Sequence, residues 1–158
     1  MKNNVILRQL RYIFDLSDSQ MINIFDQADA IVTRALVSDW LKKEDNEDYE
    51  TLSDFELATF LNGFINLRRG KKEGPQRPPE KRLNNNLIFR KLKIALAYKD
   101  TDIMDIYKRA DVSVSKHEIS AFFRNPNQKQ YRECKDQFLR NFLPVSYTHL
   151  RAHETCGH

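Results

Sequence analysis

Apolar residues recur three and four positions apart along most of the chain, which is the spacing that places side chains on one face of an α-helix. In the first half of the chain this pattern predicts helices over residues 5–15, 18–28, 34–43 and 54–68. No stretch alternates apolar and polar residues as a half-buried strand does. The pattern therefore predicts an all-α fold.

Sequence signals for helix starts support the predicted boundaries. Three segments have the capping-box pattern, in which a serine caps the helix and a Gln or Glu three residues later reaches back: Ser17 to Gln20, Ser53 to Glu56 and Ser115 to Glu118. Asn4 and Asn86 precede apolar runs, so we expect them to act as N-caps as well.

The second half of the chain repeats the first. Residues 3–61 align without a gap on residues 85–143 at an offset of 82, and 16 of the 59 aligned positions are identical. A gapless match of this length indicates a duplicated structural unit, so each copy should form the same four helices. We expect a pseudo-twofold pair of units whose cores are built from the shared apolar positions: Leu10, Ile24, Val32, Leu57, Phe60 and Leu61 with their counterparts.

Glycine and proline separate the copies. Residues 70–83 contain two Gly and three Pro, which do not sustain a helix interior, so we predict a linker there. The predicted organisation is a first repeat over residues 1–69, a basic linker over 70–83 and a second repeat over 84–143 with a shortened last helix.

Several segments resemble a known family. They are LRQLRYIF near the start, WLKKED at Trp40, FLNGFI at Phe60, RLNNNLIFRKLKIA at Arg82 and YRECKDQFLRNFL at Tyr131. Over residues 1–143 the chain resembles the YehS-like bacterial proteins, a family classed as a domain of unknown function. The resemblance implies a duplicated helical bacterial protein, and it supplies no catalytic residues.

Residues 144–158 have a different character. The segment VSYTHLRAHET, residues 145–155, resembles one reading frame of a transposase adapter used to prepare sequencing libraries. We therefore expect residues 144–158 to be an artefactual tail. The spacing of His149 and His153, with Glu154, Cys156 and His158 nearby, would otherwise suggest a metal site. With the tail excluded as one excludes a tag, we predict no metal and no cofactor.

Charge is distributed unevenly. The chain has 26 Lys and Arg against 22 Asp and Glu, and a net charge of +4 is too small to indicate nucleic-acid binding by itself. Residues 44–50 (EDNEDYE) carry five carboxylates and no base, whereas residues 68–82 carry seven bases and two acids. One cysteine, Cys134, remains outside the tail, and no apolar run is long enough for a membrane span or a signal peptide. We expect a cytoplasmic protein without membrane attachment.

Two features suggest nucleic-acid binding. The second and third helices of each copy resemble a helix-turn-helix, although the turn glycine is replaced by Ile31 and Ser113 and the join is about two residues too long. Basic residues on the first helix recur in both copies, and they either hold phosphates, form a solvated face or pair with the acidic residues 44–50. The candidate nucleic-acid residues are Arg8, Arg11, Arg34, Arg68, Arg69, Lys71, Lys72, Arg82, Arg90, Lys93 and Lys116.

No motif for catalysis is present. The nucleophile elbow, the phosphate-binding loop, the dinucleotide fingerprint and the zinc-protease motif are all missing from the sequence. Cys134 and His117 could pair as nucleophile and base, but their counterparts are Leu52 and Ala35, which favours a buried structural cysteine and a surface histidine. We predict a non-enzymatic interaction module that binds a protein partner; the alternative is a nucleic-acid binder.

Overall fold

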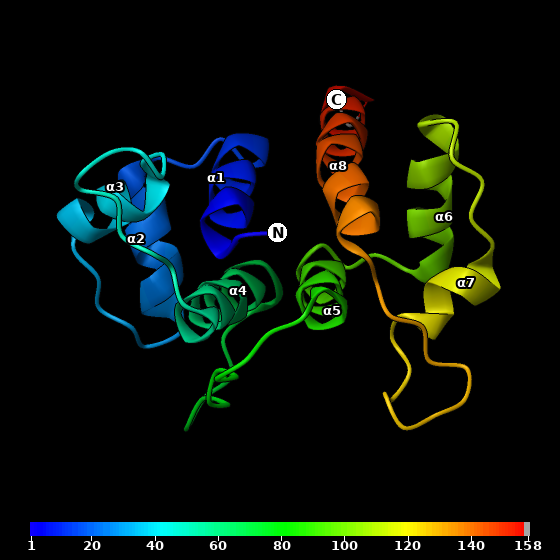
Figure 1. Cartoon of the computed structure of the whole chain (residues 1–158), viewed down its shortest axis with the longest axis horizontal. Helices are drawn as coiled ribbons and strands as arrows, with labels where there is room; N and C mark the ends of the chain where they lie inside the picture. The colour runs from blue at the N-terminus through cyan, green and yellow to red at the C-terminus, as the bar shows by residue number, and fades with distance from the viewer. Residues whose placement is uncertain (157–158) are drawn as a thin grey trace. The chain divides into compact units, whose positions relative to one another are not determined.

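The computed structural model describes the backbone of residues 1–156 and the side chains of residues 1–146. All regular structure in this part of the chain is helical, which confirms the predicted all-α fold (Figure 1). The helices are α1 (Asn3–Ile13), α2 (Asp18–Gln27), α3 (Arg34–Leu41), α4 (Asp54–Arg69), α5 (Asn85–Ala95), α6 (Asp100–Arg109), α7 (Lys116–Ala121) and α8 (Asp136–Cys156). The chain divides into two compact units, Met1–Leu83 and Asn84–His158.

The two units are built alike, as the duplication predicts. Helices α1 and α2 each end with a residue in the left-handed conformation, at Asp15 (φ 50°) and Asp29 (φ 60°). The equivalent positions in the second unit, Ala97 (φ 56°) and Asp111 (φ 59°), adopt the same conformation. At all four sites the backbone N–H groups close a Schellman motif, which satisfies carbonyls at the helix end. The repeat therefore preserves the geometry of the helix ends as well as the helices.

Serine caps form where the sequence predicts them. Ser17 and Ser53 close reciprocal capping boxes with Gln20 and Glu56. Ser115 accepts a hydrogen bond from the backbone N–H of Glu118, and its hydroxyl donates to the side chain of that residue. These contacts explain why α2, α4 and α7 begin where they do.

The predicted capping role of Asn4 and Asn86 is wrong. Helix α1 starts after Lys2, and α5 starts after Asn84, whose side chain accepts from the N–H of Leu87. Asn4 and Asn86 lie inside the first turn with their side chains buried. Their amides bond to backbone that is far away in sequence, as described below.

Each unit has its own apolar core. In the first unit Phe25 packs against Trp40 and Phe60, with ring centroids 5.4 and 5.3 Å apart. In the second unit the shared positions are joined by further aromatic rings, including Phe138 stacked on Tyr107 at 4.3 Å. All the predicted core positions are buried except Val32, which is half-buried. Burial of these faces is the main favourable term that holds each helix in place.

The units differ in how their fourth helix meets their second. In the first unit α4 approaches α2 at Gly63, where a Cβ atom would lie 1.8 Å from the carbonyl oxygen of Ile24. Only glycine allows this approach, because any side chain would overlap that oxygen. The equivalent position in the second unit is Val145. Helices α6 and α8 therefore cannot repeat this close contact.

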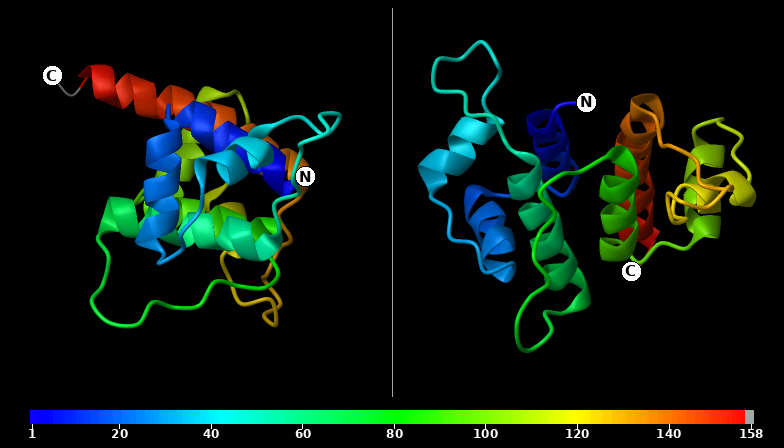
Figure 2. Two further views of the ribbon diagram at one scale, coloured as in Figure 1. Left: turned by 90° about the vertical axis from the view of Figure 1, so that its left-hand side faces the viewer. Right: turned by 60° about the horizontal axis from the view of Figure 1, so that its bottom comes forward.

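The structure has no helix between α4 and α5, over the segment drawn in green in Figure 2. Helix α7 is shorter than expected and ends at Ala121. The last helix is longer than expected: α8 passes through Pro144 and continues to Cys156, so the shortening expected at Leu143 is not observed. Among the described residues, no helix is both long enough and apolar enough to cross a bilayer.

Candidate functional site

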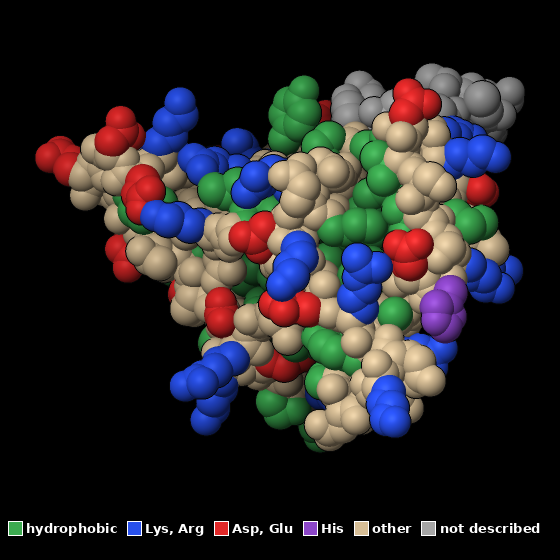
Figure 3. All heavy atoms as spheres, turned by 45° about the vertical axis from the view of Figure 1, so that its right-hand side comes forward, with side chains coloured by type: hydrophobic (Ala, Val, Ile, Leu, Met, Phe, Trp, Pro, Cys, Tyr) green, Lys and Arg blue, Asp and Glu red, His purple; other side chains and the backbone are tan. Residues whose placement is uncertain are grey.

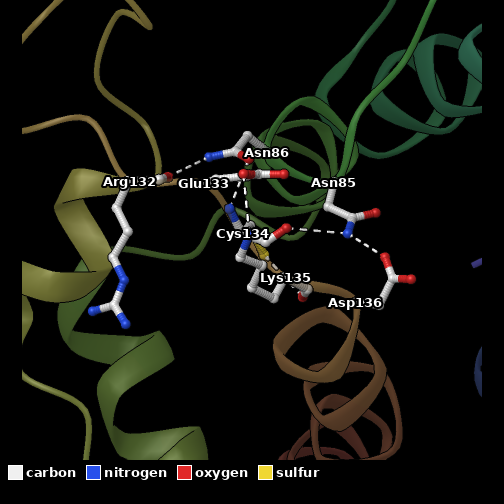
Figure 4. A network of polar contacts seen from close by, with 7 residues as sticks. All are labelled: Asn85, Asn86, Arg132, Glu133, Cys134, Lys135 and Asp136. Carbon is white, nitrogen blue, oxygen red and sulfur yellow. Dashed lines mark hydrogen bonds and ion pairs between the residues drawn. The ribbon is translucent and has the colours of Figure 1, made fainter.

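A buried asparagine organises one loop in each unit. In the second unit the amide nitrogen of Asn86 donates to the carbonyl oxygen of Arg132 at 2.8 Å (Figure 4). It also donates to the carbonyl oxygen of Phe122 at 3.0 Å. Its amide oxygen accepts from the backbone N–H of Cys134 at 2.8 Å. Since Asn86 is 7% exposed, these bonds satisfy an amide that would otherwise be costly to bury. They also fix both ends of the segment between α7 and α8.

The first unit contains the same clamp. The amide nitrogen of Asn4 donates to the carbonyl oxygens of Trp40 and Glu50 at 2.9 and 2.8 Å, and its oxygen accepts from the N–H of Leu52 at 3.0 Å. Asn4 is 2% exposed. Every partner occupies the position equivalent to its counterpart in the second unit. We call these contacts the asparagine clamp.

A second asparagine ties each loop to the start of the following helix. Asn85 donates to the carbonyl oxygen of Cys134 at 3.1 Å and to the carboxylate of Asp136 at 2.6 Å. The hydrogen bond from Asn85 lowers the pKa of Asp136. Asn3 makes the equivalent bonds to Leu52 and Asp54, at 3.1 and 2.7 Å. The loop and the first turn of α4 or α8 are thus held by one polar network.

The clamped segments have opposite charge. We call residues 42–53 the first loop and residues 124–135 the second loop. The first loop carries five acids and two bases, a net charge of −3, and the second carries four bases and one acid, a net charge of +3. Their backbones form equivalent turns, because the bonds that close each turn recur at an offset of 82. The fold therefore presents opposite charges on the same backbone frame.

Some loop charges are paired within their own unit. Lys42 bonds to Asp39 at 2.6 Å and lies 3.8 Å from Asp48, and its hydrogen bond to Asp39 raises its pKa. Lys2 pairs with Glu44. The remaining acids of the first loop are exposed and form no ion pair among the described residues: Asp45, Glu47 and Glu50.

In the second loop two of the four bases are paired. Arg132 lies 3.3 Å from Glu118, and Lys135 lies 3.2 Å from Glu133. All four of these side chains are exposed, so the pairs contribute little to stability. Lys129 lies in the middle of the loop sequence and is exposed. The two loops are thus available to a partner, and a partner would meet a different charge on each.

Five of the eleven candidate nucleic-acid residues make contacts within their own unit. Arg11 pairs with Asp18 at 3.4 Å, and Lys93 makes the equivalent pair with Asp100 at 2.7 Å. The other three contacts are Arg34 with Ser19 at 3.3 Å, Arg68 over the rings of Phe14 and Phe64, and Lys71 with Asp29 at 2.5 Å. The recurring stripe on α1 and α5 is therefore partly structural, because its members tie the first helix to the second.

The other six candidates have no ion pair among the described residues: Arg8, Arg69, Lys72, Arg82, Arg90 and Lys116. All but the half-buried Arg8 are exposed. On the face drawn in Figure 3, basic side chains are interspersed with acidic and apolar ones and do not gather in one patch.

Helices α2 and α3 do not form the predicted helix-turn-helix. In that motif the second helix begins where the first one ends, after a short turn. Here the connection over residues 28–33 runs back alongside α2, and Arg34 at the start of α3 bonds to Ser19 at the start of α2 (Figure 1). Six extended residues reach about 20 Å, enough to cover the roughly 15 Å length of a ten-residue helix.

The backbone shows why the expected turn glycine is absent. The left-handed residues are Asp29 and Asp111, directly after the helix ends, and not Ile31 and Ser113. Aspartate tolerates this conformation better than most residues. The long join was the sequence signal that separates this arrangement from a helix-turn-helix.

Cys134 is a core residue. It is 2% exposed, and burial raises the pKa of its thiol to about 12. The thiol is therefore protonated at neutral pH and is a poor nucleophile. His117 is exposed on α7, and the hydrogen bonds that Cys134 donates go to Asn86 and Lys135. Within residues 1–146 no group of three His, Cys, Asp or Glu is placed to hold a metal ion. The His149 and His153 cluster lies outside the residues whose side chains are described.

Comparison with known proteins assigns the chain to a family. The model of a family of proteins of unknown function, DUF1456, matches it twice, over residues 3–70 and 85–151. The chain belongs to this family. The two matches coincide with the two clamped units, and the second extends past Leu143 into the segment expected to be a tail.

A second comparison supports the assignment. The uncharacterized protein YehS of Escherichia coli (strain K12) is 42% identical over 144 residues, which cover 90% of this chain and 92% of that protein. This confirms the predicted family. No solved structure matches the chain.

The asparagine clamp was not predicted from the sequence. Asn4 and Asn86 are identical in the two copies and precede apolar runs, which is also the signature of an N-cap. The one available signal was the doublet: an asparagine pair, Asn3-Asn4 and Asn85-Asn86, recurs in the two copies at the same place, although only one residue is needed for a cap.

Proposed function

We propose that the protein is a non-enzymatic interaction module of the cytoplasm, which binds a protein partner through the first and second loops. One observation carries this proposal. The same buried clamp holds two loops in equivalent backbone conformations, while their net charges are −3 and +3. Loop surfaces positioned by a rigid scaffold are the usual place for binding residues.

The clamp lowers the free-energy cost of ordering the loops when a partner binds. A partner that meets a disordered loop must order it, at a cost of about 0.5 to 1.5 kcal/mol for each side chain that it immobilises. Here both ends of each loop are already fixed to a helix by three hydrogen bonds. A preorganised loop offers its charges to a partner at a lower cost.

Charge complementarity would set the choice of partner. The first loop fits a partner segment rich in Lys and Arg, and the second fits one rich in Asp and Glu. Opposed charges across an interface raise association rates and reject partners with the wrong charge. The buried, protonated thiol of Cys134 supports the non-enzymatic part of the proposal.

The test is affinity capture from a cell lysate with quantitative mass spectrometry. In one variant the first loop is neutralised by Glu44→Gln, Asp45→Asn, Glu47→Gln and Asp48→Asn. In the matched control, four exposed acids elsewhere are neutralised by Asp15→Asn, Asp26→Asn, Glu73→Gln and Asp105→Asn. We expect the loop variant alone to lose the captured protein. Equal recovery with both variants would contradict the proposal.

A further inference from the structure

The basic linker between the units is held in place along the first unit. Lys71 pairs with Asp29 at 2.5 Å near the start of the linker, and the N–H of Leu83 donates to Asp54 at 2.9 Å at its end. Between them, the side chain of Gln76 accepts from Asn66 of α4 at 3.1 Å. Three contacts therefore anchor the linker at its start, middle and end.

Gln76 also shapes the linker locally. Its amide nitrogen donates to the carbonyl oxygens of Lys72 and Gly74 at 2.8 and 3.1 Å. Gly74 has φ +88°, a conformation that glycine adopts without strain. Gln76 thus holds the bend over residues 72–76 and ties it to α4. The linker is ordered by the first unit itself and needs no partner for this.

Most basic residues in and next to the anchored linker form no ion pair within the described part of the chain. Of the seven bases in residues 68–82, Arg68 lies over two aromatic rings and Lys71 is an anchor. The other five are exposed and form no ion pair among the described residues; we call them the free linker bases: Arg69, Lys72, Arg77, Lys81 and Arg82. Basic side chains that stand on an anchored backbone and form no ion pair are suited to hold an anion.

We propose that the linker binds the phosphate backbone of nucleic acid through the free linker bases. The site is formed by other residues than the clamped loops and goes beyond the function proposed above. The three prolines within residues 75–79 keep the linker extended beyond the bend, so Arg77, Lys81 and Arg82 follow one another along it. A line of bases matches a chain of phosphates better than it matches a single phosphate group.

The composition of the linker favours nucleic acid over a membrane surface. Residues 70–82 contain no aliphatic or aromatic side chain apart from proline, so nothing there can insert into a bilayer. For the same reason no side chain can stack on a base. We therefore expect binding without sequence preference, dominated by counterion release and steeply dependent on salt.

The experiment measures the affinity of the full chain for a fluorescent oligo(dT) strand at several salt concentrations. If all five free linker bases contact phosphates, the slope of log K against log salt should be about −3.5 for a single strand. Replacement of three bases, in Arg77→Gln/Lys81→Gln/Arg82→Gln, should reduce the slope to about −1.4 and weaken binding about 100-fold at 0.1 M salt.

A matched control removes the same charge elsewhere. Lys108→Gln/Arg109→Gln/Arg140→Gln neutralises three exposed bases of the second unit, and it should leave the slope unchanged. All of these side chains are exposed, and circular dichroism checks that both variants remain folded. An equal loss of slope in both variants would overturn the assignment to the linker.

A further variant tests the anchoring. Gln76→Ala changes no charge but removes the bonds that hold the bend, so it should weaken binding several-fold with an unchanged salt slope, because only the cost of ordering rises. No change in affinity would show that the anchors are irrelevant to binding.

The absence of binding to DNA and RNA strands at low salt would overturn the proposal. Binding to phosphatidylserine vesicles in place of oligonucleotides would overturn it too. None of these results bears on protein capture by the loops.

Discussion

The two repeats keep the same frame and differ in what they expose. Both have the asparagine clamp, the Schellman motifs and the ion pair between the first and second helices. Over residues 1–69 the first repeat has 8 bases and 12 acids, whereas over residues 84–143 the second has 12 bases and 7 acids. Residues that define the fold have stayed alike, while the surface has diverged to opposite charge. This contrast is the reason to place function on the surface that differs.

The fourth helix gives the sharpest structural difference. Gly63 allows α4 to touch the backbone of α2, and Val145 stands at the equivalent place in α8. We expect Gly63→Ala to destabilise the first unit by about 3 kcal/mol or more, because the new methyl group would overlap a backbone oxygen and the helices would have to separate. Denaturant unfolding measures this. The control, Val145→Ala, should cost less than about 1.5 kcal/mol; equal effects would show that the two contacts are alike.

Removal of the clamp should affect both repeats. Asn4→Ala and Asn86→Ala each leave two carbonyls and one N–H without their buried partner, and each should cost about 2 to 3 kcal/mol. Hydrogen exchange should show faster exchange in the loop of the altered unit alone, at Leu52 or at Cys134. Faster exchange in neither loop would mean that the clamp does not hold the loops.

The core cysteine makes the second repeat sensitive to alkali. The pKa of Cys134 is raised from 9.0 to about 12 by burial, so folding favours the neutral thiol. The resulting stability is fully present below pH 9 and is lost as the pH rises from 9 towards 12. At pH 10 the loss should be about 1 kcal/mol.

The control for this effect comes from the first repeat, which has Leu52 at the same position. In Cys134→Leu the part of the pH dependence that is due to the thiol should vanish, and this can be measured by unfolding at pH 8 and pH 10. The buried Tyr107, whose pKa burial also raises, will still contribute above pH 10. An unchanged difference between the two pH values would contradict the assignment to Cys134.

The smallest effect concerns the helix ends. Ala97 has a left-handed backbone (φ 56°), while its counterpart Asp15 is a residue that tolerates this conformation. Ala97→Gly should therefore stabilise the second repeat by about 0.5 to 1 kcal/mol, and Asp15→Gly should have a smaller effect. Thermal unfolding of the two variants tests this. A destabilising Ala97→Gly would mean that the helix end is not strained.

The sequence predicted the features that depend on neighbouring residues. Apolar spacing and serine caps gave the helices and their starts, because both act within one or two turns. The offset of 82 gave the duplication. The linker followed from its Gly and Pro content.

What the sequence could not predict depends on contacts between distant residues. The clamp joins Asn4 to residues 36 to 48 positions away, and local patterns carry no trace of such a bond. The end of α7 at Ala121 lies within an apolar run, so periodicity alone extended the helix. The course of the connection beside α2 is set by packing. For the same reason, only the structure separates the paired Lys71 from the free linker bases.

The central claim is that the charge on each clamped loop, and not the fold, selects the partner. An exchange of residues 44–50 with residues 126–132 tests it directly, because the segments have equal length and the exchange leaves the net charge of the chain unchanged. We predict that the free energy of unfolding of the exchanged protein differs by less than about 1 kcal/mol from that of the original chain. The exchanged protein should nevertheless no longer capture the same protein from a lysate. Undiminished capture by a folded exchange variant would contradict the claim.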